Sequence, residues 1–291
     1  MNTKISKFCF LQRHQIPQIL ILVSSFAILY SHTIVEMMKN WNRDDNFSHG
    51  FLIPVISAFM IWQKRGLLAQ QNTNPSTWGI IIILAAMFMH IIGAISAEMF
   101  TMRTSLIVCI TGSVIYLFGF RIFLIIGIPV IYLFFMIPIP KIIWNQISFP
   151  LQLMAAELAS AMVQLLGIPI LREGNILHLS NTTLEVMDAC SGLRSLTSLL
   201  ALSGAFAYII KLRMFSRWLL FLSAIPIAIL VNILRLTVTA VLATYVGAET
   251  AHGFLHDLSG ILVFIVAFII LYAFQAFLRR IENRFEAHSA T

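Results

Sequence analysis

The apolar stretch at residues 78–97 constrains the fold most strongly, because it holds no Asp, Glu, Lys or Arg. About twenty apolar residues are what an α-helix needs to cross the ~30 Å hydrocarbon core of a membrane. Hydrophobic residues make up 59% of the 291-residue chain and charged residues 11%. A soluble domain carries roughly 25% charged residues. The sequence therefore predicts an integral membrane protein.

We expect an all-α polytopic fold with about eight transmembrane helices in a single domain, residues 1–291. The predicted spans are residues 16–37, 50–62, 78–97, 105–118, 122–136, 193–210, 218–246 and 259–277. The first is too long for a cleaved signal peptide. Residues 150–166 repeat apolar positions at helical spacing, which predicts an amphipathic helix at the membrane surface. Residues 172–186 alternate apolar and polar residues, which predicts a small β-hairpin.

The basic residues orient these spans. With the N-terminus in the cytoplasm, twelve Lys and Arg fall in cytoplasmic segments and six fall outside, as positive-inside orientation requires. Ten of the twelve acidic residues also fall outside, which indicates the same orientation independently of the basic residues. This predicts cytoplasmic tails at 1–14 and 279–291 and an outer segment at 138–192. The six outer basic residues are Lys39, Arg43, Arg103, Lys141, Arg172 and Arg194.

The net charge of +7 does not indicate a nucleic-acid-binding protein. The basic residues lie in short loops between apolar runs, which is the pattern that membrane orientation produces. Two of the three cysteines, Cys9 and Cys109, are predicted to be ordinary residues. Their spacing indicates neither a disulfide framework nor a zinc site, so no metal or cofactor is expected.

Cys190 stands at the start of the predicted sixth span, between Asp188 and Arg194. The unpaired N–H groups and the dipole of a helix N-terminus lower the pKa of a thiol. The neighbouring residues are small or polar, which favours an accessible thiolate. A small buried hydrophobe is the alternative role of a free cysteine.

Arg235 lies within the seventh predicted span, about 27 Å along the helix from Arg217 at 1.5 Å per residue. This depth corresponds to the outer half of the bilayer. An arginine there costs several kcal/mol unless it faces a polar cavity or a partner. Pairing with Asp188 or Glu185, or extension toward the outer surface, is the structural alternative. Asn232 shares the helical face of Arg235.

His256 and Asp257 open the last predicted span on the same side, and His252 lies one turn earlier. A capping or interfacial role is the alternative to catalysis, and either histidine could be the catalytic one. Together, Cys190, Arg235 and His256 allow nucleophilic catalysis. The thiolate attacks a carbonyl, the imidazole transfers protons, and the guanidinium stabilises the thiolate or the developing oxyanion.

Several motifs follow one another along the chain: residues 46–54 (NFSHGFLIP), 166–169 (LGIP) with 172–175 (REGN), 189–194 (ACSGLR), 232–235 (NILR) and 254–260 (FLHDLSG). In this order they resemble the exosortase/archaeosortase family of membrane transpeptidases. The resemblance implies an eight-span fold and an active site of Cys190, Arg235 and His256. It also implies a multi-pass protein of the bacterial inner membrane whose active site faces the periplasm.

By the same resemblance, the substrates are exported proteins that end in a Pro-Glu-Pro-like motif, one transmembrane helix and a basic tail. Cleavage would proceed through a thioacyl intermediate, with transfer to a cell-surface acceptor in cells that produce extracellular polysaccharide. Membrane lipids are the other expected partners. An arginine would pair with the acidic residue of the motif. The candidate substrate-binding residues are Arg194, Arg172, Asp188, Asn232 and His49.

Two other functions fit the sequence. A purely hydrolytic intramembrane cysteine protease would share the acyl-enzyme step and use water as the acceptor. A transporter or assembly factor for polysaccharide or lipid would use Arg235 and His256 to bind an anionic substrate, and Cys190→Ser would then be nearly harmless. The acceptor, the cleavage position, the substrate range and the oligomeric state are left open by the sequence.

Overall fold

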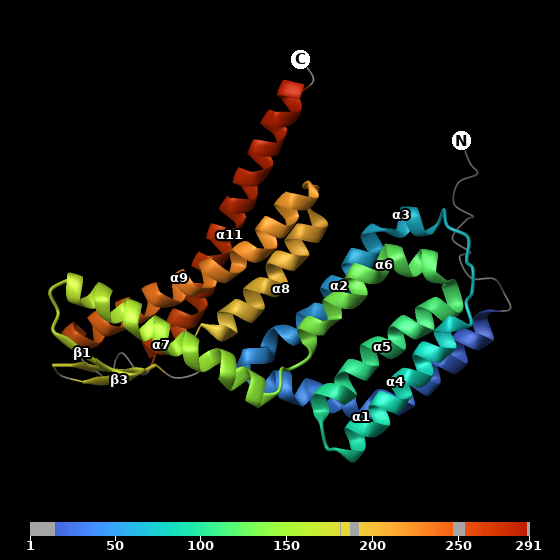
Figure 1. Cartoon of the computed structure of the whole chain (residues 1–291), viewed down its shortest axis with the longest axis horizontal. Coiled ribbons are helices and arrows are strands. Elements are labelled where there is room, and N and C mark those ends of the chain that lie inside the picture. Colours follow the sequence, from blue (N-terminus) through green and yellow to red (C-terminus); the bar gives the residue numbers. More distant parts are fainter. Residues whose placement is uncertain (1–14, 181, 187–191, 247–253, 290–291) are drawn as a thin grey trace. The chain divides into compact units, whose positions relative to one another are not determined.

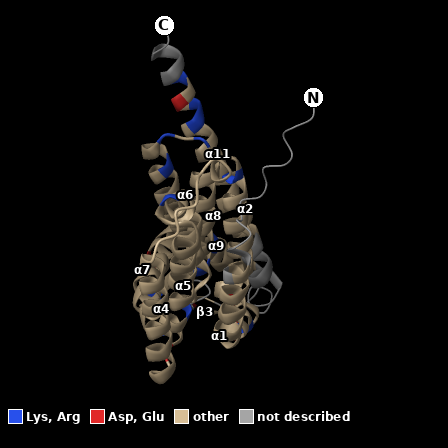
Figure 2. Cartoon of the chain, turned by 90° about the vertical axis from the view of Figure 1, so that its right-hand side faces the viewer, with Lys and Arg blue, Asp and Glu red and all other residues tan. Residues whose placement is uncertain are grey.

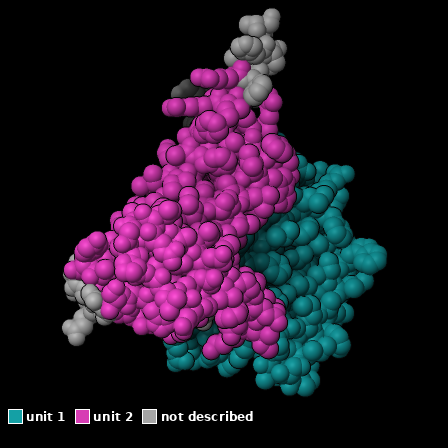
Figure 3. All heavy atoms as spheres, turned by 60° about the vertical axis from the view of Figure 1, so that its left-hand side comes forward, with its two compact units in different colours: residues 1–139 teal, residues 140–291 magenta. Residues whose placement is uncertain are grey.

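The computed structural model describes residues 15–180, 182–186, 192–246 and 254–289, with parts of the helix ends, including 254–261, described by their backbone alone. The chain forms two compact units, residues 1–139 and residues 140–291 (Figure 3). Helices predominate in both, and a small sheet belongs to the second (Figure 1).

The first unit consists of helices. In chain order they are α1 (Gln15–Arg43), the 3-10 helix η1 (Asp45–Phe51), α2 (Leu52–Gln63), α3 (Arg65–Leu68), α4 (Trp78–Ile95), α5 (Met99–Phe118), α6 (Phe120–Tyr132) and the 3-10 helix η2 (Leu133–Met136). α4 and α5 form a hairpin that is closed by Glu98. Its carboxylate caps α5 by accepting hydrogen bonds from the N–H groups of Phe100 (2.9 Å) and Thr101 (2.6 Å).

This cap makes α5 begin earlier than residue 105, the start that the sequence predicts. Arg103, predicted in an outer loop, therefore lies inside α5, where its side chain is 5% exposed. The carboxylates of Glu36 and Glu98 are near enough to interact with it electrostatically. A buried arginine needs such opposite charge, because an uncompensated charge is costly away from water.

Hydrogen bonds between distant segments hold the first unit together at both ends. The indole Nε1 of Trp41, near the end of α1, donates to the carbonyl oxygen of Met136 in η2 (2.8 Å). At the other end, the N–H of Asn74 donates to the carbonyl oxygen of Phe118 (3.2 Å). The ends of α1 and η2 thus lie together, as do the entry to α4 and the end of α5.

The second unit contains α7 (Lys141–Leu165), β1 (Ile170–Glu173), β2 (Ile176–Leu179), β3 (Thr183–Glu185), α8 (Leu193–Ile209), α9 (Met214–Val246) and α11 (Phe254–Ser289). The predicted amphipathic helix 150–166 is the second part of α7. Pro150 lies within this helix, although proline is typical of the first helical turn. Because of this preference, the sequence predicts that the helix begins at residue 150, whereas α7 begins at Lys141.

The sheet is antiparallel with the strand order β1-β2-β3. The predicted hairpin corresponds to β2 and β3, and β1 is an additional strand. β1 turns into β2 through the two residues Gly174 and Asn175, since Glu173 pairs with Ile176. Gly174 adopts a positive φ of 64°, as tight hairpin loops require. The extra strand was missed because this loop is so short.

α9 forms the centre of the second unit and packs against different partners along its length. Its first part lies against α8 and α11 through Leu220, Ala224, Ile227, Ala228 and Val231. Its second part lies against α7 and the sheet through Ile233, Leu236, Ala240 and Ala243. The partners therefore change over about one turn, between Ile229 and Ile233.

Among the described residues, five helices are long and apolar enough to cross a membrane, or up to six if one bent pair counts as a span. The five are Ile19–Arg43, Trp78–Ile95, Met99–Phe118, Met214–Tyr245 and Leu262–Arg284. α2, α6 and α8 lie where spans are predicted but are shorter than 18 residues. Most of the helical residues that Figure 2 colours are neither Lys, Arg, Asp nor Glu. The membrane fold is confirmed, and the count of eight spans stays a prediction.

Candidate functional site

Two of the three predicted catalytic side chains are not described by the structure. Cys190 and Asp188 lie in the segment 187–191, outside the described residues, and His252 lies in another such segment, 247–253. His256 is placed in the first turn of α11 by its backbone alone. The described part of the candidate site consists of the residues that follow Cys190 and the face of α9 that carries Arg235.

Gly192 joins the Cys190 segment to α8. It is the N-cap of this helix and has a positive φ of 79°, in the left-handed region. Its carbonyl oxygen accepts hydrogen bonds from the N–H of Leu196 (2.8 Å) and the hydroxyl of Ser195 (2.9 Å). A residue other than glycine adopts this backbone conformation only at a cost. α8, with its positive dipole end, begins at Leu193, three residues after the cysteine.

Asn232 lies directly against Gly192. A Cβ atom on Gly192 would lie 3.0 Å from Cβ and 3.0 Å from Cγ of Asn232, a separation tighter than ordinary side-chain contact. Asn232 is 2% exposed and stands where α9 changes its packing partners. The chain that leaves Cys190 is thus brought against the middle of α9.

Arg235 follows Asn232 by three residues on α9 and is partly buried. Residues three apart on a helix share a face, so Asn232 and Arg235 lie on the same face of α9. Asn232 places this face beside the start of α8, through its contact with Gly192. Thr239 donates its hydroxyl hydrogen to the carbonyl oxygen of Arg235 (2.9 Å). Since α9 begins at Met214, Arg235 lies about 32 Å along it at 1.5 Å per residue.

Arg194 occupies the first turn of α8, two residues after Gly192, and is partly buried. Its carbonyl oxygen accepts a hydrogen bond from the hydroxyl of Thr197 (3.1 Å). Its position in sequence keeps it close to the Cys190 segment. A role in binding the acidic residue of a substrate stays a prediction.

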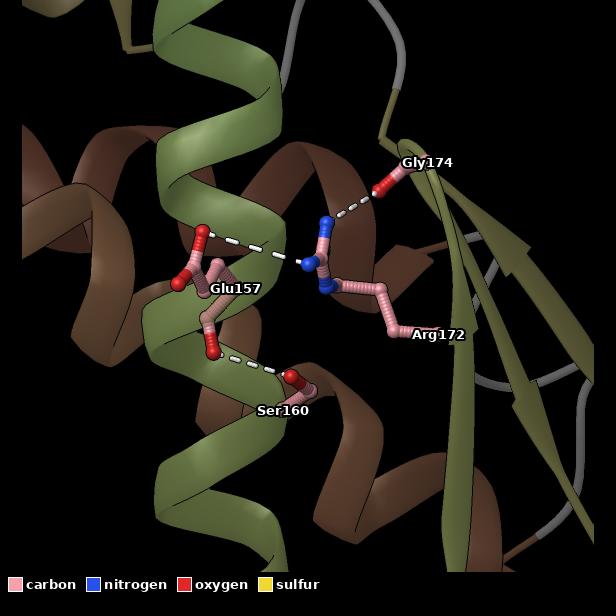
Figure 4. Close-up of polar contacts among 4 residues, drawn as sticks. All are labelled: Glu157, Ser160, Arg172 and Gly174. Atoms are coloured by element: carbon pink, nitrogen blue, oxygen red, sulfur yellow. Dashed lines mark hydrogen bonds and ion pairs between the residues drawn. The ribbon is translucent and has the colours of Figure 1, made fainter.

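Arg172, the second basic candidate, lies on β1 and faces α7. Its guanidinium lies 3.9 Å from Oε2 of Glu157 and donates to the carbonyl oxygen of Gly174 (3.2 Å) (Figure 4). The Arg172 side chain is 34% exposed and that of Glu157 is 68% exposed. A substrate carboxylate at Arg172 would therefore compete with Glu157.

His49 belongs to the first unit, in η1. Burial lowers the pKa of this imidazole, although a hydrogen bond to the backbone of Phe135 opposes the shift. The adjacent Gly50 lies against the Trp41 indole, and a Cβ there would overlap the ring. Within the first unit, His49 and Gly50 thus hold η1 against α1 and η2.

The described residues contain no group of three or more His, Cys, Asp or Glu side chains that could hold a metal ion. The sequence indicated Asn232 through its spacing from Arg235 and through the motif at residues 232–235. The sequence did not predict the contact between Gly192 and Asn232. The only feature that pointed to it was the position of a glycine directly before an apolar helix.

Comparison with known proteins identifies a family for this arrangement. A family model described as transmembrane exosortase matches residues 41–273, a range that holds the Cys190 segment, Gly192, Asn232, Arg235 and His256. No curated protein and no solved structure matches the chain. The family match covers most of the chain and agrees with its long apolar helices. The chain therefore belongs to the transmembrane exosortase family.

Proposed function

We propose that this protein is a membrane-embedded cysteine transpeptidase that cleaves the C-terminal sorting signals of exported proteins. Membership of the exosortase family supports a transpeptidase role in protein sorting. The observation that carries the proposal is the contact of Gly192 with Asn232. It brings the chain segment that leaves Cys190 against the helix that carries Arg235.

In the proposed mechanism, the thiolate of Cys190 attacks the carbonyl carbon of the scissile peptide bond. Arg235 stabilises the thiolate and then the oxyanion of the tetrahedral intermediate. As the C–N bond breaks, His256 gives its proton to the leaving amine, and a thioester remains on Cys190. An acceptor amine or hydroxyl then attacks the thioester and gives its proton to His256, and the C–S bond breaks to release the Cys190 thiolate.

We propose that this chemistry takes place at the outer face of a bacterial inner membrane, with both termini in the cytoplasm. The distribution of basic residues supports this orientation. Within the first unit, the ends of α1 and η2 that Trp41 and Met136 join belong to the outer side in this topology. The substrate tail would carry a Pro-Glu-Pro-like motif, a transmembrane helix and basic residues.

A processing assay tests the proposal. A tagged exported protein with such a tail is co-expressed with the wild type, Cys190→Ala or Cys109→Ala, and its size is followed by immunoblot. We expect Cys190→Ala to abolish tail removal and Cys109→Ala, the matched control, to retain it. Equal processing by wild type and Cys190→Ala would refute the nucleophile and favour a transporter of anionic substrates.

The mass of the product then separates transfer from hydrolysis. A covalently attached acceptor raises the mass of the new C-terminus above that of the free acid. We expect this increase in membranes that contain the acceptor. A free carboxylate as the only product under those conditions would identify a hydrolytic protease.

A further inference from the structure

The two edge strands of the small sheet, β1 and β3, have different neighbours in the second unit. α7 runs beside β1, and the Nε2 of Gln164 on that helix donates to the outward carbonyl oxygen of Ile170 (3.3 Å). This edge is therefore covered. Covering an edge with a helix is a common way to protect unpaired strand groups.

The hydrogen bonds of β3 show which of its residues face β2. The N–H of Leu179 donates to the carbonyl oxygen of Thr182 (2.8 Å), and the N–H of Val186 donates to that of Asn175 (2.9 Å). In an antiparallel pair, every second residue exchanges such bonds. Leu184, midway between Thr182 and Val186 and paired with β2, therefore directs its backbone groups to β2.

The backbone N–H and C=O groups of Thr183 and Glu185 consequently point away from β2, along the outer edge of β3. Both residues are exposed. β3 is the last strand of the sheet, and among the described residues no further strand pairs with it. A row of outward donors and acceptors is the surface to which an additional extended chain binds.

This edge is held firmly from behind. Leu184 (8% exposed) and Val186 (1%) pack with Leu177 (1%) in the apolar core that also contains residues of α7 and α9. The strand therefore presents its outer edge on a fixed support.

The edge also lies close to Cys190 along the chain. Five residue steps separate Glu185 from Cys190, so their Cα atoms are at most about 18 Å apart even in a fully extended chain. A peptide of five or six extended residues covers the same length. A chain paired with β3 can therefore extend to the cysteine.

We propose that the outer edge of β3 binds the extended segment of the substrate around its cleavage site as a fourth strand of the sheet. This inference rests on the proposed function, because the substrate is identified as the bound peptide from the short chain distance between β3 and the proposed nucleophile Cys190. Main-chain hydrogen bonds to Thr183 and Glu185 hold the peptide extended, a conformation that exposes its carbonyl groups to a nucleophile. They tolerate varied side chains, since backbone groups are common to every sequence.

A proline substitution isolates the backbone contribution. Glu185→Pro removes an outward N–H but no bond to β2, and proline is compatible with an edge strand in that orientation. Glu185→Ala removes only the side chain and is the matched control. In the processing assay we expect Glu185→Pro to be about three- to tenfold slower than Glu185→Ala, the effect of one lost hydrogen bond. Equal rates for all three proteins would overturn the proposal.

Two further measurements distinguish loss of substrate binding from misfolding of the variant and from binding of a different chain at this edge. A photo-reactive residue at Thr183, in a Cys190→Ala background, should crosslink to the tagged substrate, and the absence of this product would refute the proposal. A change in oligomeric mass for Glu185→Pro would assign the edge to a second copy of the chain instead. Normal processing by Cys190→Ala contradicts the proposed function itself, whereas normal processing by Glu185→Pro contradicts only the fourth strand.

Discussion

Gly192 and Asn232 are in direct contact although forty residues separate them, and a Cβ on Gly192 would stand 3.0 Å from Cβ and 3.0 Å from Cγ of Asn232. The contact joins the N-terminus of α8 to the point where α9 changes its packing partners. Any shift here moves the chain that leads back to Cys190.

Gly192→Ala should therefore abolish processing by steric displacement. The substitution adds the cost of a left-handed alanine, about 1–2 kcal/mol, to a clash with a buried side chain. Gly167→Ala is the matched control, because Gly167 has the same φ of 79° and nothing within 4 Å of its Cβ position. We expect Gly167→Ala to lower the melting temperature in detergent yet retain activity. Equal processing by the two variants would show that the Gly192 contact does not position the site.

Arg235 provides a second prediction, on catalysis. Arg235→Gln should lower the processing rate about 10²- to 10³-fold, as the loss of an oxyanion-stabilising group does, with little change in melting temperature. Arg235→Lys should recover part of the rate, since the charge is kept but the planar guanidinium is lost. Arg217→Gln, at the start of the same helix, serves as the control and should process normally. A rate for Arg235→Gln within twofold of wild type would exclude a catalytic role.

The membrane class and the family could be predicted from the sequence, because long uncharged runs and short motifs are local features. Helix starts were less predictable. Glu98 starts α5 early and buries Arg103, while Pro150 lies inside α7 rather than at its start. Capping and proline tolerance depend on the surrounding contacts, which periodicity does not encode.

The candidate site shows the same division. The spacing of Asn232 and Arg235 on one helix face was evident from the sequence, since it follows from helical geometry. The approach of Gly192 to Asn232 was not, because it results from the packing of two helices. The predicted meeting of Cys190, Arg235 and His256 stays a prediction, as two of these side chains lie outside the described residues.

Gly50 supplies a prediction for the stability of the first unit. Gly50→Ala would force the Trp41 indole away and so weaken the hydrogen bond from its Nε1 to Met136 (2.8 Å). We expect a loss of more than about 2 kcal/mol, in the range of core overpacking, seen as a lower melting temperature in detergent. Gly66→Ala is the control, because nothing lies within 4 Å of its Cβ position. It lies in α3, so alanine should be neutral or stabilising. Equal melting temperatures for the two variants would contradict this account.

His49 predicts how the stability of the protein depends on pH. Burial lowers the pKa of His49 below that of an exposed histidine, so the unfolded state binds its proton first as the pH falls. The stabilising contribution is complete above about pH 6.5 and declines as the pH falls through the lowered value. Melting temperatures at pH 8 and pH 5 should therefore differ less in His49→Gln than in wild type. The same difference in both proteins would show that His49 does not titrate in this way.

Glu157 and Arg172 form a pair whose two variants separate substrate binding from stability. The guanidinium and carboxylate lie 3.9 Å apart and both side chains are exposed, so either substitution should change stability by less than about 1 kcal/mol. If Arg172 binds the acidic residue of the sorting motif, Glu157→Gln removes a competitor and should speed processing two- to threefold. Arg172→Gln should slow it, and replacing the acidic residue of the substrate by Gln should eliminate both effects. If Arg172→Gln still slows the processing of a substrate that lacks the acidic residue, Arg172 stabilises the sheet and does not bind the sorting motif.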